Sequence, residues 1–305
     1  MSDGKPWLAD RETSTETAVR RIERQFPELR PTSATLFSEG WDNRAFLVND
    51  RFVFRFPRRE VAVELLRAET RLLPSLVDRL PIAISAATFV GQPDEDDDWP
   101  FAGYERIPGT TACRADLDED TRRRMAALIG RFLRALHAVP EADAVGAGAP
   151  HDTWRRLDLP YRREQVEERL AQCRENGLLD RTDEWSRLAD DIPADWTPAR
   201  TTLVHGDLYA RHLLVDETGD PCGVIDWGDV HVGDRAIDLS VARGFLPPSA
   251  AEAFLDAYGP VDPDTWRVAR FKALFSAIMI LLYGADIDDR ELVREARTSL
   301  EHLRG

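Results

Sequence analysis

The sequence predicts an α+β protein of two lobes, with an antiparallel sheet and a helix in the first third and a mostly helical remainder. Short alternating apolar and polar segments, separated by turn residues, follow one another between residues 34 and 107, as in antiparallel strands. From residue 118 onward, apolar residues recur at helical spacing over several long stretches. A short hairpin within 203–239 interrupts the helical stretches and carries the acidic motifs.

The first third can be assigned in chain order. A helix is expected over 13–26, with Thr13 or Ser14 as its N-cap and an apolar stripe on one face. The acidic loop 92–99 is expected to be a solvated tip. The remaining expected elements are a helix at 60–73, closed by Pro74, and strands at 34–37, 44–48, 52–56, 81–91 and 100–107.

The second lobe is expected to be helical. Residues 118–137 place six apolar side chains on one face of a helix. The most apolar run, 273–283, is shorter than the ~20 residues needed to cross a bilayer, so we expect a buried helix there. Further helices are expected at 162–176, 183–190, 250–258, 264–283 and 289–304, and a loop at 141–150.

Composition limits the partners. The formal net charge is −15, which argues against nucleic acid, because a protein that grips phosphates needs a basic face. A negative cleft would attract a cationic small molecule, although acidic surfaces also serve solubility alone. Cys113, Cys173 and Cys222 fit neither a disulfide framework nor a zinc spacing, and the first residues do not resemble a signal peptide. We therefore expect a cytoplasmic protein that does not enter membranes.

Two acidic motifs border the predicted hairpin within 203–239. Its strands are expected at 213–215 and 223–225. The motif HGD, ending at Asp207, precedes the first strand, and the motif DWGD, beginning at Asp226, follows the second, so the hairpin would bring both carboxylates to one end. This arrangement suits phosphoryl transfer from a nucleotide, in which one Asp accepts the hydroxyl proton and the other holds Mg²⁺ between the β- and γ-phosphates.

These motifs also resemble a known family. HGD followed by IDWG, with strand-turn-strand between them, is similar to the H-x-D catalytic loop and the D-x-G metal loop of the aminoglycoside phosphotransferase family, relatives of the protein kinases. The run HGDLYARHLL has His212 where most of that family has Asn, which is closer to the macrolide phosphotransferase branch. The resemblance implies a catalytic Asp207, with Asp226 and His212 as metal ligands.

The resemblance covers about residues 35–283 and implies a bilobal protein-kinase-like fold. The nucleotide-binding lobe would be 1–107, and the catalytic and acceptor-binding lobe would be 108–305. Arg55 is expected to point away from the face that its strand neighbours share and to pair with Glu69 near the α- and β-phosphates. Kinases use Lys at this position, and Arg keeps the charge but is bulkier. An exposed Arg and a solvated Glu are the alternative.

Two more segments are implied as nucleotide contacts. The loop 38–43, which includes Asn43, lies where kinases place a loop over the phosphates, although it has a single glycine. In the hinge, the carbonyl of Glu105 and the N–H of Ile107 would bind the base, with Tyr104 lining the pocket. These side chains do not separate ATP from GTP, and the macrolide branch favours GTP.

Three functions remain open at this point. The first is an antibiotic kinase acting on a hydroxyl of a macrolide or aminoglycoside; the second is a metabolic kinase for choline, a sugar or an amino alcohol; the third is an inactive nucleotide-binding pseudokinase. His212 supports the third, because imidazole is a poor ligand for Mg²⁺, yet it could also orient the loop or bind Mn²⁺. Candidate acceptor contacts are Asp229, Asp286, Asp288, Asp289, Trp227 and Trp266.

Two further carboxylates are expected to be structural. Asp234 and Asp238 lie in the motif GDRAIDL at the start of an apparent helix. A carboxylate near a helix N-terminus accepts hydrogen bonds from free N–H groups. We expect Asp238 to cap this helix or to hold the backbone of the catalytic loop.

Overall fold

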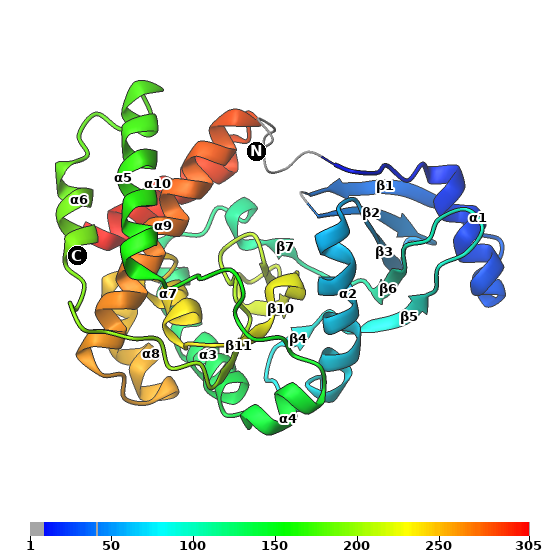
Figure 1. The fold of residues 1–305 in the computed structure, drawn as a ribbon, viewed down its shortest axis with the longest axis horizontal. Helices are drawn as coiled ribbons and strands as arrows, with labels where there is room; N and C mark the ends of the chain where they lie inside the picture. The colour runs from blue at the N-terminus through cyan, green and yellow to red at the C-terminus, as the bar shows by residue number, and fades with distance from the viewer. Residues whose placement is uncertain (1–8, 41, 305) are drawn as a thin grey trace. The chain divides into compact units, whose positions relative to one another are not determined.

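A computed structural model describes residues 9–40 and 42–304, and its mixed architecture confirms the predicted α+β fold class. The chain, coloured by position in Figure 1, divides into two compact units. The smaller unit contains the chain up to Asp78 together with Ile84–Ile107 and Asp226–Val230, and the larger unit contains the rest. Asp226–Val230 groups with the smaller unit because its short 3-10 turn, Trp227–Asp229, packs on helix α2 (Glu60–Leu72).

The smaller unit is built on a five-stranded antiparallel sheet in the order β1-β2-β3-β6-β5. In Figure 1 this sheet lies between helices α1 and α2. Ser14 caps α1 by accepting a hydrogen bond from the N–H of Thr17, as the sequence predicted. The elements are α1 (Thr15–Gln25), β1 (Ala34–Glu39), β2 (Asn43–Val48), β3 (Phe52–Pro57), α2 (Glu60–Leu72), β5 (Ala87–Gly91) and β6 (Phe101–Glu105).

The two faces of this sheet differ in chemistry. One face is an aromatic core, in which Phe54 and Phe56 of β3 pack with Phe101 of β6 beneath α1. Because successive strand residues point to opposite faces, Arg55 between these phenylalanines points to the other face. It meets α2 there, so strand alternation alone places this cation beside the helix.

The acidic loop 92–99 is solvated at Glu95 and Asp98, as the sequence suggested, but other carboxylates of the loop form ion pairs that the sequence did not predict. Arginines of α1 bind it, because the apolar face of that helix fixes its basic residues next to the loop. Arg21, whose side chain is 1% exposed, donates to the Asp94 carboxylate (Nε–Oδ2, 3.1 Å) and to the Trp99 carbonyl (2.7 Å). Arg20 pairs with Asp96 at 3.0 Å. The loop is therefore an ionic connection between helix and sheet.

The larger unit is mainly helical. Helix α9 is its centre and packs against α5, α7 and α10. This helix is long and apolar enough to span a membrane by length and composition, but half of its most apolar window is buried inside the protein, as in a core helix. The helices are α3 (Glu119–His137), α4 (Glu141–Gly146), α5 (Leu159–Glu175), α6 (Asp183–Asp190), α7 (Ala236–Gly244), α8 (Ala251–Tyr258), α9 (Pro263–Asp286) and α10 (Arg290–Arg304). Of these, α4 occupies a segment expected to be a loop.

The predicted hairpin is present in the larger unit. Strands β9 (Leu213–Val215) and β10 (Pro221–Val224) pair antiparallel, and β7 (Thr110–Thr111) adds to β9. Strand β8 (Thr202–Val204) pairs with β11 (His231–Gly233). The segment from His205 to His212 therefore connects two buried strands, which fixes both of its ends. The short strand β4 (Ala83–Ile84) lies beside β10 in the four-stranded sheet β4-β10-β9-β7.

We predict that Arg21→Met lowers the free energy of unfolding by about 3 kcal/mol, because removing one partner of a buried ion pair leaves the other carboxylates uncompensated. Urea denaturation followed by circular dichroism measures this loss. Arg20→Met is the matched control, since its side chain is 53% exposed, and its effect should be much smaller. Equal losses in the two variants would contradict the buried role of Arg21.

Candidate active site

A buried ion pair joins the sheet and α2 in the smaller unit. Arg55 donates from Nη1 to Glu69 Oε2 at 3.2 Å. Glu69 is almost fully buried, and its carboxylate lies on the side of α2 that faces the sheet. The structure thus brings together the cation and the carboxylate that the sequence paired, and the alternative of two solvated side chains is wrong.

Asp226 shares this arginine. Arg55 donates from Nη2 to Asp226 Oδ1 at 2.9 Å. Asp226 has a left-handed backbone (φ 61°) that begins the 3-10 turn, and its side chain is 47% exposed. Burial opposes the charge of Arg55, but the two carboxylates raise the pKa of its guanidinium above the ordinary value. Arg55 is therefore a permanent cation held between Glu69 and a solvent-accessible Asp226.

The loop before β2 is shorter than the sequence suggested. Strand β1 ends at Glu39 and β2 begins at Asn43, so the strands include residues expected in the loop. Near its end, Asp42 pairs with Arg59 at 2.8 Å, and burial raises the pKa of Asp42. The side-chain oxygen of Asn43 is buried and has no hydrogen-bond partner among the described residues. A phosphate contact by Asn43 stays a prediction.

The expected hinge residues follow strand β6. Tyr104 is buried, and its ring lies 5.7 Å from Cζ of Arg55, so it contacts the arginine. Burial and the nearby Glu69 raise the pKa of the Tyr104 hydroxyl well above its ordinary value. Glu105 ends the strand, and its side chain binds Arg51 at 3.0 Å. Ile107 lies beyond the strand, and its contact with a base stays a prediction.

Asp207 belongs to the larger unit, in the segment that follows β8. Its N–H donates to Nδ1 of His205 at 3.3 Å, and Nε2 of His205 donates to the Ile225 carbonyl at 3.1 Å. These two bonds require a neutral imidazole that is protonated on Nε2. Burial lowers the pKa of His205, which is consistent with the neutral form. His205 therefore orients the loop around Asp207.

His212 closes the same segment. Its Nδ1 donates to the Asp207 carbonyl at 2.8 Å, which orients the ring within this segment. Among the described residues, no group of three or more His, Cys, Asp or Glu side chains forms a metal cage. Mg²⁺ needs none, because it takes one or two carboxylates and completes its shell with phosphate and water. The exposed carboxylate of Asp226 fits this role better than imidazole does.

Asp238 holds the backbone of the segment from His205 to His212, which confirms one of the two roles predicted for it. Its carboxylate accepts from the N–H groups of His205 (2.7 Å) and Gly206 (3.0 Å) and lies 3.2 Å from Nε2 of His137. Burial alone would raise the pKa of Asp238, but these hydrogen bonds hold it below its usual value. Asp234 lies just before α7 and accepts from the N–H of its first residue, Ala236, at 2.8 Å.

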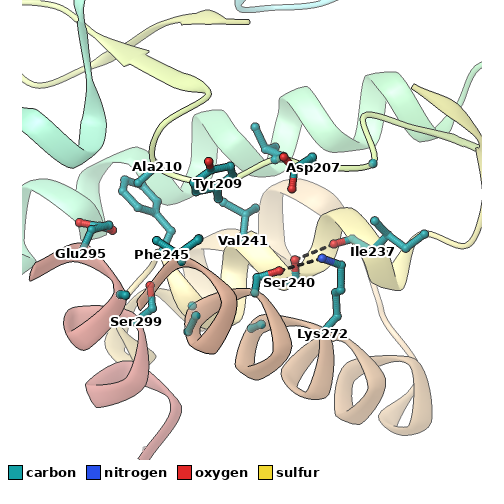
Figure 2. A pocket seen from close by; sticks show the side chains of 18 residues that line it. Asp207, Tyr209, Ala210, Ile237, Ser240, Val241, Phe245, Lys272, Glu295 and Ser299 are labelled. Atoms are coloured by element: carbon teal, nitrogen blue, oxygen red, sulfur yellow. Dashed lines mark hydrogen bonds between the residues drawn. The ribbon is translucent and has the colours of Figure 1, made fainter. Parts of the chain in front are cut away.

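A pocket lies beside Asp207 in the larger unit (Figure 2). Its lining comes from residues 206–210, α7, α9 and α10, and its volume is about 500 Å³ including space open to solvent. Lys272 of α9 enters the lining and donates to Ser276 Oγ at 2.7 Å. The sequence interpretation missed Lys272. A signal existed, because the chain has only two lysines, Lys5 and Lys272, among its 40 basic residues.

None of the carboxylates and tryptophans suggested as acceptor contacts lines this pocket. Asp289 caps α10 by accepting from the N–H of Leu292 at 3.0 Å. Trp266 packs on Phe254 of α8, with ring centroids 6.1 Å apart, and Trp227 is fully buried. Capping and core packing account for these three residues.

The sequence matches a family of enzymes. Residues 33–271, most of the chain, match the phosphotransferase enzyme family, and the chain belongs to it. A viomycin phosphotransferase from Streptomyces vinaceus is 25% identical over 264 residues, which cover 81% of this chain and 86% of that protein. An uncharacterized Bacillus subtilis protein, YcbJ, is 30% identical over 82 residues, spanning only 26% of its own length.

Solved structures share the fold. The GDP and kanamycin complex of APH(2")-IIia is 27% identical, covers 94% of this chain and 98% of its own, and has a TM-score of 0.69. Macrolide 2'-phosphotransferase MphH from Brachybacterium faecium superimposes with a TM-score of 0.60 at 21% identity, over 93% of this chain and 98% of its own. The protein is thus a kinase-like phosphotransferase, with structural neighbours among both aminoglycoside and macrolide enzymes.

We predict that Asp238→Ala lowers stability and turnover together, by about 3 kcal/mol for stability, because two buried N–H groups lose their acceptor. Melting temperature and nucleoside diphosphate release measure the two effects, with exposed Asp256→Ala as the control. The native pKa is depressed, so this stability is present above about pH 4 and is lost as pH falls through the folded value. An unchanged melting temperature with reduced turnover would contradict the structural role.

Proposed function

We propose that the protein transfers the γ-phosphoryl group of ATP or GTP to a hydroxyl of a small antibiotic-like molecule, of the macrolide or aminoglycoside type. The observation that carries this proposal is Arg55, held between buried Glu69 and exposed Asp226 at 3.2 and 2.9 Å. A fixed cation beside an accessible carboxylate is the arrangement that a metal-bound triphosphate requires. The names of the viomycin and kanamycin proteins support an antibiotic acceptor.

Each residue then has a distinct role. Asp207 orients the acceptor hydroxyl and takes its proton, while the hydroxyl oxygen bonds to the γ-phosphorus and the bond to the β–γ bridging oxygen breaks. Asp226, with His212, would hold Mg²⁺, which neutralises charge on the phosphates when bound. Arg55 adds positive charge, and Asn43, Tyr104, Glu105 and Ile107 would contact the nucleotide.

Two alternative functions accompany this proposal. The first is a metabolic kinase that phosphorylates choline, a sugar or an amino alcohol with the same residues, and the second is an inactive pseudokinase. We place the enzyme in the cytoplasm, without a nucleic-acid or membrane partner. The net charge of −15 suggests a cationic acceptor, and the charged residues that line the pocket are Asp207, Glu295 and Lys272.

An acceptor panel tests this function. Macrolides, aminoglycosides, viomycin, choline and amino sugars are each incubated with Mg²⁺ and with ATP or GTP, and release of nucleoside diphosphate is compared with an acceptor-free reaction. We expect release above background with an antibiotic. Release with choline or small sugars alone would favour the metabolic kinase, and no release despite nucleotide binding would favour the pseudokinase.

We predict that substitution of Asp207 and substitution of Asp226 impair different steps, turnover and nucleotide binding respectively. Asp207→Ala should reduce kcat more than about tenfold, which corresponds to an increase of ~1.4 kcal/mol or more in the activation free energy. Nucleotide affinity should be nearly unchanged. Asp226→Ala should weaken binding of the Mg²⁺ complex of the nucleotide and leave metal-free binding much less affected. Calorimetry with and without Mg²⁺ and steady-state kinetics separate the two. If Asp207→Ala keeps more than a tenth of kcat, Asp207 is not the base.

A further inference from the structure

The pocket beside Asp207 has a mostly uncharged lining. Alanine, serine and glycine make up much of it. Its larger apolar side chains are Leu208, Ile237, Val241, Phe245 and Ile280. Apolar walls with a few hydroxyl groups suit an acceptor that has a carbon-rich body and carries mainly hydroxyl groups.

Carboxylates are scarce in this pocket. Among the described residues that line it, Asp207 and Glu295 are the two carboxylates. Both oxygens of Glu295 accept hydrogen bonds from Arg122, at 2.8 and 2.6 Å, and both side chains of this ion pair are buried. A bidentate guanidinium already serves as the counter-ion of Glu295. The lining therefore offers an acceptor ammonium group no carboxylate except Asp207, the proposed base.

Lys272 adds a positive charge to the same lining. In Figure 2 its side chain extends from α9 toward the segment that carries Asp207. Its ammonium donates to Ser276 Oγ at 2.7 Å and lies 5.7 Å from the ring centre of Phe275. These contacts hold the ammonium at the pocket wall, where it would repel an ammonium group of a bound acceptor.

The local charges and the net charge of the chain act at different distances. The net charge of −15 draws cations toward the whole protein, but charges beyond a Debye length of about 8 Å are largely screened at physiological salt. The pocket lining therefore decides which molecule is held at Asp207. An aminoglycoside carries several ammonium groups, whereas a macrolide has a large apolar body, hydroxyl groups and few amines. The lining matches the second description.

We propose that this pocket selects an acceptor of the macrolide type, and that Lys272 is the residue that disfavours acceptors with several ammonium groups. This inference rests on the proposed function and chooses between the two acceptor types named there. The pocket volume of about 500 Å³, including space open to solvent, is in the range of sites that hold small molecules. The part of the acceptor that carries the reacting hydroxyl would enter it, beside Asp207.

Reversal of the charge at residue 272 tests this selection. Steady-state kinetics with saturating Mg²⁺ and nucleotide gives kcat/KM for kanamycin and for erythromycin. We expect the wild type to favour erythromycin, and Lys272→Glu to raise the ratio of kanamycin to erythromycin at least about tenfold. Lys272→Gln, which removes the charge alone, should give an intermediate ratio.

Arg267→Glu is the matched control for the charge reversal. Arg267 lies on the same helix, is 43% exposed, pairs with Asp191 and does not belong to the pocket lining. The variant changes the net charge by the same amount as Lys272→Glu, and it should keep the wild-type ratio. Equal ratios in the two Glu variants would show that the charge at residue 272 has no local effect, and the role of Lys272 would be refuted.

Calorimetry measures acceptor binding without turnover. The proteins are saturated with Mg²⁺ and a non-hydrolysable nucleotide, and their melting temperatures report whether each variant is folded. We expect the wild type to bind erythromycin at least about tenfold more tightly than kanamycin, and Lys272→Glu to narrow this difference. Tighter binding of kanamycin by the wild type, or binding of neither compound, would overturn the selection. Kanamycin turnover by the wild type in that case would leave the proposed function intact, whereas no turnover with any acceptor would count against the function itself.

Discussion

The carboxylate of Asp238 is the contact on which the segment from His205 to His212 depends. This one buried group accepts from the N–H groups of His205 and Gly206 and contacts His137, so α7, α3 and the segment after β8 meet at two oxygens. A buried carboxylate is tolerated only when its hydrogen bonds are satisfied, so the loss of one of these bonds would destabilise the others. Asp207 follows Gly206 in the chain, so its position depends on this contact.

Sequence patterns predicted the fold class and the local identity of much of the site. The alternation around Arg55 was sufficient to place it opposite the phenylalanines, and the resemblance to the kinases supplied Glu69 as its partner. The hairpin between β9 and β10 followed from its turn residues in the same way. Periodicity works for these features because it records which side of an element is buried.

Long-range charge pairing was harder to predict from sequence. The acidic loop 92–99 resembled a solvated tip, since nothing in its composition indicates that Arg21 lies beside it. Similarly, the contact between Asp226 and Arg55 joins residues far apart in the chain and was not predicted. Lys272 was overlooked because a lysine in an apolar helix is normally explained by its long stem reaching solvent. Such contacts depend on tertiary packing, which periodicity does not encode.

The divided guanidinium of Arg55 affects how a donor would enter. One arm is bound to Glu69 and the other to the same Asp226 oxygen that a metal would approach. Under the proposed function, a divalent ion at Asp226 would replace Arg55 as the counter-ion of this carboxylate. The released arm of the arginine would then be available to the phosphates of the donor. Affinity for the donor would therefore depend on the difference in free energy between the Arg55–Asp226 contact and the contact of Arg55 with the phosphates. It should change with the length of the side chain at residue 55.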